Sequence, residues 1–151
     1  MSIQIIEAYY RAFNSGDFDA MLALLSNDVA HDVNQGTREI GKDAFAQFLE
    51  RMNTSYHEQL SDLIIMGDSM NKRFAAEFIV DGVYLKADPG FPEARGQRYR
   101  LPAGAFLEVA NGLIARVTTY YNLSDWLLQV SDGQWSVRPT PEPEPDTDTA
   151  P

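Results

Sequence analysis

Cysteine is absent from this chain of 151 residues, and histidine occurs only twice, as His31 and His57. The lack of cysteine excludes disulfide bonds, thiol catalysis and cysteine-based zinc sites. Two histidines cannot form a three-histidine metal centre, and the chain has no phosphate-binding loop, dinucleotide fingerprint or Gly-x-Ser-x-Gly motif. We therefore expect a protein that uses no metal ion and no other cofactor.

Long apolar runs and basic clusters are also missing. No stretch approaches the ~18 uninterrupted apolar residues of a transmembrane helix, and no basic leader precedes an apolar run near the first residue. We therefore expect neither a membrane anchor nor a signal peptide, and a cytoplasmic location. The formal net charge is −10, and removing the four acidic residues of Pro139–Pro151, which has no basic residue, still leaves −6. Such an acidic chain is not expected to bind nucleic acid.

The first half of the chain predicts three helices and a short hairpin. Apolar residues recur at helical spacing over Ile3–Phe13 and, after an Asn-Ser-Gly stop and a capping aspartate, over Phe18–Leu25. A short strand at Val29–Val33 and a return at Arg38–Ile40 follow. The third helix opens at a Gly-Lys-Asp sequence, and its apolar face extends over residues 45–56.

The second half predicts strands, at Leu63–Met66, Arg73–Leu85, Arg98–Val109 and Leu113–Asn122, the last two joined by an Asn-Gly hairpin turn. Helices segregated from an antiparallel sheet indicate an α+β fold. We predict a cone-shaped α+β barrel in which three N-terminal helices pack on a curved antiparallel sheet. The mouth of such a cone is suited to a ligand cavity.

After a short amphipathic segment at Leu123–Val130, the chain ends in a Pro-rich acidic tail. We expect one folded domain over residues 1–130. We expect the tail at residues 131–151 to be disordered, because it has too little apolar surface to fold.

Two stretches of this sequence carry a family resemblance. The first is AYYRAFNSGDFDAMLALLSNDVAHDVNQG, followed by REIGKDAFAQFL, and the second is NGLIARVTTYYNLSDW near the end. Their order resembles the nuclear transport factor 2-like superfamily, which includes ketosteroid isomerases and SnoaL-like polyketide cyclases, and the likeness covers Ile3 to Val130. The resemblance implies the cone-shaped fold and identifies residues 1–130 as a SnoaL-like domain, similar to the ketosteroid isomerase-related proteins.

The resemblance places only part of an isomerase site on this chain. In ketosteroid isomerases a tyrosine and a protonated acid hydrogen-bond the developing oxyanion while an aspartate moves the proton. The tyrosine falls on Tyr9 and the base on Asp32 or Val33, but the protonated acid falls on Gly104, which has no carboxyl group. We therefore expect no true ketosteroid isomerase activity.

His31 and Asp32 are the most polar residues of an otherwise apolar strand. Their side chains point to opposite faces, so only one of them can face the cavity, and the sequence leaves open which one does. We predict that Tyr9 and one of these two residues are catalytic, as hydrogen-bond donor and general base. The structural alternatives are a core tyrosine bonded to a backbone carbonyl, and a strand-end residue bonded to the turn at Asn34-Gln35.

The resemblance implies that one face of the last strand, with Val117, Thr119 and Tyr121, looks into the cavity. We add Phe106 of the preceding strand as a fourth ligand-binding residue. This mostly apolar wall with a few hydroxyl groups predicts a small, partly apolar ligand.

Two functions follow from these observations. The first is a cofactor-free proton-transfer enzyme, such as an isomerase, cyclase or dehydratase. The second is a non-catalytic dimeric module that binds a ligand or a protein. In both functions we expect a homodimer joined through the outer faces of the long strands, because the family forms such dimers and because Ile79, Val83 and Leu107 provide apolar side chains for them.

Overall fold

The computed structural model describes residues 2–34 and 36–133, so most of the predicted tail, residues 134–151, lies outside the described part. The described residues form helices and strands in the following order: α1 (Ser2–Ser15), α2 (Phe18–Ala23), β1 (Leu25–Asp32), β2 (Arg38–Ile40), α3 (Lys42–Ser55), β3 (Tyr56–Gly67), β4 (Arg73–Tyr84), β5 (Gln97–Ala110), β6 (Leu113–Tyr121) and α4 (Leu123–Val130). Among these residues, none of the helices has the length and apolar character needed to cross a membrane.

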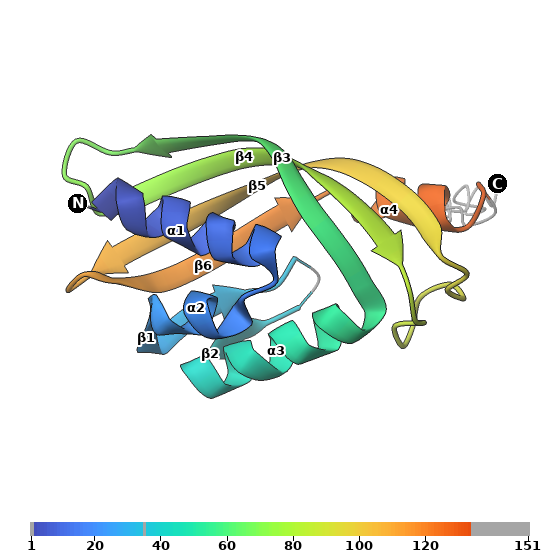
Figure 1. Cartoon of the computed structure of the whole chain (residues 1–151), viewed down its shortest axis with the longest axis horizontal. Coiled ribbons are helices and arrows are strands. Elements are labelled where there is room, and N and C mark those ends of the chain that lie inside the picture. Colours follow the sequence, from blue (N-terminus) through green and yellow to red (C-terminus); the bar gives the residue numbers. More distant parts are fainter. Residues whose placement is uncertain (1, 35, 134–151) are drawn as a thin grey trace, which may run out of the picture.

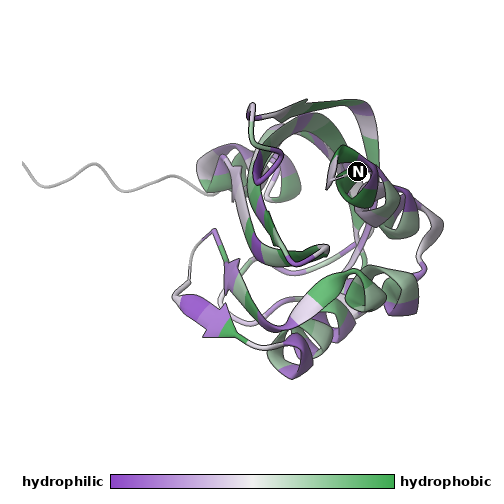
Figure 2. Cartoon of the chain, turned by 90° about the vertical axis from the view of Figure 1, so that its left-hand side faces the viewer, coloured by the Kyte–Doolittle hydropathy of each residue, from purple (hydrophilic) through white to green (hydrophobic). Residues whose placement is uncertain are grey.

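The six strands form one sheet in the order β2-β1-β6-β5-β4-β3. Helices α1, α2 and α3 lie on one side of this sheet, and α4 lies at the end away from the N-terminus (Figure 1). Figure 2 shows the strongly curved path of the strands, which do not close into a complete barrel. The α+β fold with helices packed on a curved sheet is therefore confirmed.

One strand pair differs from the antiparallel prediction. Strand β1 pairs with β6 in parallel, whereas the other neighbouring strands are antiparallel. These two strands are far apart in the chain, so no hairpin turn sets their relative direction, and local sequence patterns cannot show it.

The second helix is shorter than its apolar pattern predicts. The α2 helix begins after Asp17, whose side chain accepts a hydrogen bond from the Ala20 amide at 3.0 Å, and it ends at Ala23. Leu25 belongs to β1 instead, where it is fully buried and pairs with Ile114 of β6. The tertiary pairing therefore overrides the helical spacing.

Strand β3 is much longer than the predicted strand at Leu63–Met66. It starts directly after α3, at Tyr56, and its early residues alternate between an inward-facing and an exposed side chain. The side chain of Asn14 on α1 holds this strand, because it accepts a hydrogen bond from the Leu60 amide at 2.8 Å and donates one to the Leu60 carbonyl at 3.0 Å. This extension of β3 brings a polar sequence, His-Glu-Gln, into the sheet.

The core lies between the helices and the concave face of β4, β5 and β6. Leu107, which we expected on the outer face, is fully buried in this core. Ile79 and Val83 are half-buried on the opposite face. The outer face instead exposes other large side chains from β3, β5 and β6, namely Ile64, Met66, Phe106 and Tyr120.

Candidate active site

A cavity of about 650 Å³ lies between the three N-terminal helices, the concave face of the sheet and the loop after β4. Its wall is mainly apolar, with aromatic and aliphatic side chains from the helices and the sheet that include Phe13, Met21, Phe45, Phe48, Leu49, Phe78, Val80, Leu101 and Trp126. A few polar side chains interrupt this wall. An enclosed apolar cavity with a few converging polar groups is the usual form of a small-molecule site.

Glu58 is the acidic side chain that β3 directs into this cavity. The Tyr99 hydroxyl group, from β5, donates a hydrogen bond to its carboxylate. Burial raises the pKa of Glu58 to about 7, and the hydrogen bond from Tyr99 only partly opposes this rise. Near neutral pH, Glu58 can therefore both accept and release a proton.

A second tyrosine and carboxylate pair borders the same cavity. The Tyr56 hydroxyl donates a hydrogen bond of 2.9 Å to Asp88 in the loop after β4, and burial together with this bond raises the pKa of Tyr56 above its ordinary value. The loop is held in place by Tyr84, whose hydroxyl donates to the Pro92 carbonyl at 2.7 Å and accepts from the Asp88 amide at 2.9 Å. The loop wall of the cavity is thus fixed by hydrogen bonds.

Trp126 of α4 closes this end of the cavity. Its ring meets four other aromatic rings edge-on, with centroid distances of 5.2–6.1 Å, from Tyr56, Tyr84, Phe91 and Tyr99. Such edge-to-face contacts favour one arrangement of the rings. The cluster therefore holds the hydroxyl groups of Tyr56 and Tyr99 close to the two carboxylates.

Tyr9 of α1 lines the cavity, as predicted. Its ring packs edge-on against Tyr10 at 5.1 Å, and burial raises its pKa well above the ordinary value, so the hydroxyl keeps its proton. Within residues 2–34 and 36–133, no hydrogen-bond partner of this hydroxyl is found, so the alternative of a core tyrosine bonded to a backbone carbonyl is not observed. The side chain can therefore donate to a ligand.

Of the two adjacent polar residues on β1, His31 has its side chain in the cavity. It is only 4% exposed, and its ring lies 4.4 Å from Phe45 and 4.5 Å from Phe48. Burial lowers its pKa, outweighing the opposite influence of nearby acidic groups, so the imidazole is neutral at pH 7. Its Nδ1 atom is buried without a hydrogen-bond partner among the described residues.

Asp32 borders the cavity, but its carboxylate is bound elsewhere. It accepts hydrogen bonds from Arg38 Nε at 2.7 Å, from Arg38 Nη2 at 3.0 Å and from Thr118 Oγ1 at 2.6 Å. These bonds lower its pKa to about 2. Asp32 is therefore a poor base, and its proposed catalytic role is corrected in favour of His31 as the inward residue.

Three of the four predicted wall residues, Val117, Thr119 and Tyr121, line the cavity. Phe106 does not. Its side chain is 49% exposed on the outer face, where the ring packs against Tyr120 at 6.1 Å. The assignment of Phe106 to the ligand wall is wrong because its neighbours along β5, at positions 105 and 107, point inward and strand side chains alternate.

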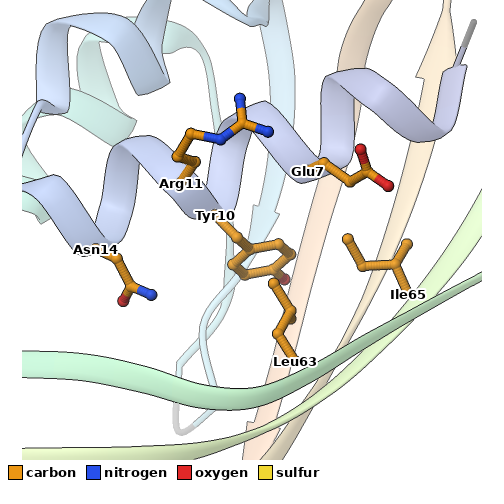
Figure 3. Close-up of a pocket in the computed structure, with 6 residues that line it drawn as sticks. All are labelled: Glu7, Tyr10, Arg11, Asn14, Leu63 and Ile65. Carbon is orange, nitrogen blue, oxygen red and sulfur yellow. The ribbon is translucent and has the colours of Figure 1, made fainter.

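A second, more open depression of about 340 Å³ lies between α1 and β3. Figure 3 shows the Tyr10 ring directed from α1 towards Leu63 of β3, with the Glu7 and Arg11 side chains on the same helix. Tyr10 and Asn14 line both this depression and the central cavity, so they belong to the wall that separates the two. In the part of the chain that the structure describes, no three acidic or histidine side chains gather closely enough to hold a metal ion.

Sequence reasoning missed Glu58, Tyr56, Tyr99 and Asp88. A signal was present at Tyr56-His57-Glu58, where an aromatic and an acidic residue two positions apart share one face if the segment is a strand. The segment does not look like a strand by itself, because its residues are polar.

The fold has known counterparts. A polyketide cyclase candidate from Pseudomonas putida is 55% identical, with a TM-score of 0.85, and the match covers 86% of this chain and 98% of that one. A polyketide cyclase candidate from Xanthomonas campestris is 56% identical, with a TM-score of 0.83 and coverage of 85% and 96%. A protein of ketosteroid isomerase-like fold from Catenulispora acidiphila, 18% identical with a TM-score of 0.69 and coverage of 88% and 97%, shares the fold.

A search of curated proteins finds no match. The model of the SnoaL-like domain family matches residues 6–117, which hold most of α1, the cavity strands up to the middle of β6, and Glu58. This chain belongs to the SnoaL-like domain family, and it has the ketosteroid isomerase-like fold.

Proposed function

We propose that this protein is a cofactor-free proton-transfer enzyme of the cyclase or isomerase type, with Glu58 as its general base. The observation that carries this proposal is a carboxyl group inside a mainly apolar cavity, hydrogen-bonded by Tyr99. Burial of a carboxylate costs free energy, so such a group is a common sign of a functional site. Three relatives that are more than half identical, all described as polyketide cyclase candidates, support the cyclase type.

The proposed reaction begins at a carbon atom next to a carbonyl group. The Glu58 carboxylate takes a proton from this carbon, and the electron pair moves to the carbonyl oxygen as an enolate. In a cyclisation the enolate carbon then attacks a second carbonyl of the same molecule, and the new alkoxide takes a proton back from Glu58. In an isomerisation the proton returns to a different carbon. Neither sequence consumes or produces an oxidant, a reductant or a co-substrate.

The oxygen atoms of the substrate need hydrogen-bond donors, and the helix and β1 sides of the cavity provide two. Tyr9 has a protonated hydroxyl group, and neutral His31 can meet a ligand through Nε2, since Nδ1 is enclosed by protein. A donor placed at a developing oxyanion typically accelerates such reactions by about 10²–10³-fold. We assign both residues to this role, with Val117, Thr119 and Tyr121 as ligand contacts.

The charges of the cavity indicate which substrates it accepts. Three acidic side chains, from Asp32, Glu58 and Asp88, border it, and Arg51 is the one lysine or arginine among the described residues of its wall. The Arg51 side chain is 67% exposed and lies near Glu39. The cavity therefore favours a neutral, partly apolar carbonyl compound over an anionic acid.

Proton exchange tests this proposal without requiring the natural substrate. The full chain is mixed with neutral 1,3-dicarbonyl compounds in D₂O, and loss of the proton signal between the carbonyl groups is followed by NMR. We expect enzyme-dependent exchange, and we expect Glu58→Gln to slow it by about 10²–10⁴-fold. Tyr9→Phe should slow it by about 10²-fold.

The matched control is Glu77→Gln, which changes an exposed glutamate on the outer face of β4 and should leave the exchange rate unaltered. An exchange rate that is the same in the Glu58→Gln variant and in the wild-type protein would contradict the proposal. Ligands that raise the melting temperature without any exchange would favour the alternative function, a non-catalytic binding module.

A further inference from the structure

Glu58, Gly82 and Tyr99 lie in one row across three neighbouring strands. Gly82 of β4 is the backbone partner of Glu58 on β3 and also of Tyr99 on β5. Neighbouring strands are about 4.8 Å apart, so the two outer residues of this row are separated by roughly 10 Å at the backbone. The Tyr99 ring and hydroxyl group nevertheless lie directly over Gly82, so the side chain crosses β4 and reaches Glu58.

The crossing is possible only because the middle residue has no side chain. A Cβ atom built on Gly82 would collide with the Tyr99 ring atoms Cζ and Cε2 and with its hydroxyl oxygen. The Gly82 backbone does not have a positive φ, so its conformation would accommodate any residue. A glycine inside a strand also weakens that strand, and it commonly marks a place where another group approaches closely. Space for Tyr99 is therefore what this position requires.

We propose that Gly82 is a positioning residue of the cavity: it forms a notch in β4 through which Tyr99 reaches Glu58 and holds its carboxyl group. Any other residue at this position would push the Tyr99 ring off the strand and break its hydrogen bond to Glu58. Gly82 thereby sets the geometry of the proposed general base, and its relevance to catalysis rests on the proposed function.

The proton affinity of Glu58 reports this geometry, because the hydrogen bond from Tyr99 stabilises the charged form of the carboxyl group. Removing the bond should raise the pKa of Glu58 further. The other titratable groups around the cavity are Tyr56 and His57 on β3, Tyr121 on β6, Asp88 in the loop after β4, Tyr9 and Tyr10 on α1, His31 and Asp32 on β1, and Arg51 on α3. None of these groups shifts the Glu58 pKa by a hydrogen bond, whereas Tyr99 on β5 does.

The test is a titration of the Glu58 carboxyl carbon by NMR in the full chain labelled with ¹³C-glutamate, with Glu58→Gln used to assign the signal. We expect Gly82→Ala to raise the Glu58 pKa by about one unit, a tenfold change in proton affinity, as expected for the loss of one hydrogen bond to a charged group. Tyr99→Leu, which removes the ring and the hydroxyl, should produce a similar rise. Adding Gly82→Ala to Tyr99→Leu should then change nothing further.

The matched control is Gly104→Ala on β5. A Cβ atom there would approach only the Ala76 carbonyl oxygen, at 3.4 Å, so this variant should leave the Glu58 titration unchanged. An unchanged Glu58 pKa in folded Gly82→Ala would overturn the inference. The inference would also be overturned if adding Gly82→Ala to Tyr99→Leu raised the Glu58 pKa by as much as Gly82→Ala does alone.

If Gly82→Ala alone does not fold, the double variant decides the question. Folding restored by Tyr99→Leu would support a clash with the ring, and continued failure to fold would refute it. The titration does not depend on enzyme activity. If it confirms the role of Gly82 while the wild-type protein catalyses no proton exchange, the proposed function is rejected and the positioning role of Gly82 remains.

Discussion

Replacing Glu58 with glutamine should stabilise the protein at alkaline pH. Burial raises the pKa of this carboxyl group from 4.5 to about 7. The folded state therefore binds the proton more tightly than the unfolded chain does, and the wild-type protein loses stability as the pH rises from about 4.5 through 7. A difference of 2.5 pKa units at 1.36 kcal/mol each corresponds to about 3 kcal/mol at pH 8.

The glutamine amide has nearly the same shape, is neutral at every pH, and can accept the hydrogen bond from Tyr99. The variant and the wild-type protein should therefore have similar stability below pH 4.5. At pH 8 the variant should be more stable by about 3 kcal/mol, which corresponds to a rise in melting temperature of roughly 10 °C for a domain of this size.

The measurement is urea denaturation of both proteins at pH 5, 6, 7 and 8. The difference between the two proteins cancels the titration of groups that they share, including His31, whose lowered pKa has the opposite effect on stability in part of this range. Glu77→Gln is the control, and its difference from wild type should not change with pH. If the difference in the free energy of unfolding between Glu58→Gln and wild type is also independent of pH from pH 5 to pH 8, the reasoning is refuted.

Two further predictions concern the outer face of the sheet. Asp32→Asn should lower the free energy of unfolding at pH 7 by about 1–3 kcal/mol, because it weakens the bonds to Arg38 and Thr118. This difference should disappear as the pH falls from about 4 through 2, because the ionised Asp32 carboxylate, whose pKa is lowered to about 2, stabilises the fold only above that range. Denaturation at pH 2 and at pH 7 checks this prediction. We also propose a homodimer that buries the exposed Phe106 and its outer-face neighbours, and Phe106→Asp should then yield a 16.9 kDa monomer in sedimentation experiments, whereas Ile40→Asp, on β2, should not. Wild-type protein that sediments only as the monomer at micromolar concentration would contradict the dimer.

Local patterns in the sequence were sufficient for the general architecture. The spacing of apolar residues predicted α1 and α3, and the Asn111-Gly112 pair predicted the hairpin between β5 and β6, in which both residues have the positive φ that such turns require. The opposite orientation of His31 and Asp32 also followed from alternation alone. These features depend on residues that are close together in the chain.

Alternation shows that neighbouring strand residues face opposite ways, but it does not show which of them faces inward. The register of the pairing decides this, and a shift by one residue exchanges the two faces. For this reason Phe106 was placed on the wrong face, and the choice between His31 and Asp32 stayed open until the structure put Asp32 beside Arg38.

Glu58 shows most clearly what only the tertiary structure decided. By itself, the segment that contains it looks like a polar connection, because neither its charge nor its neighbours suggest a buried strand. Pairing with β4 turns the segment into a strand, the curvature of the sheet directs Glu58 into the cavity, and the glycine opposite it admits Tyr99 from the next strand. The partners of Glu58 lie 24 and 41 positions further along the chain, so only the pairing of strands, and no local pattern, brings this site together.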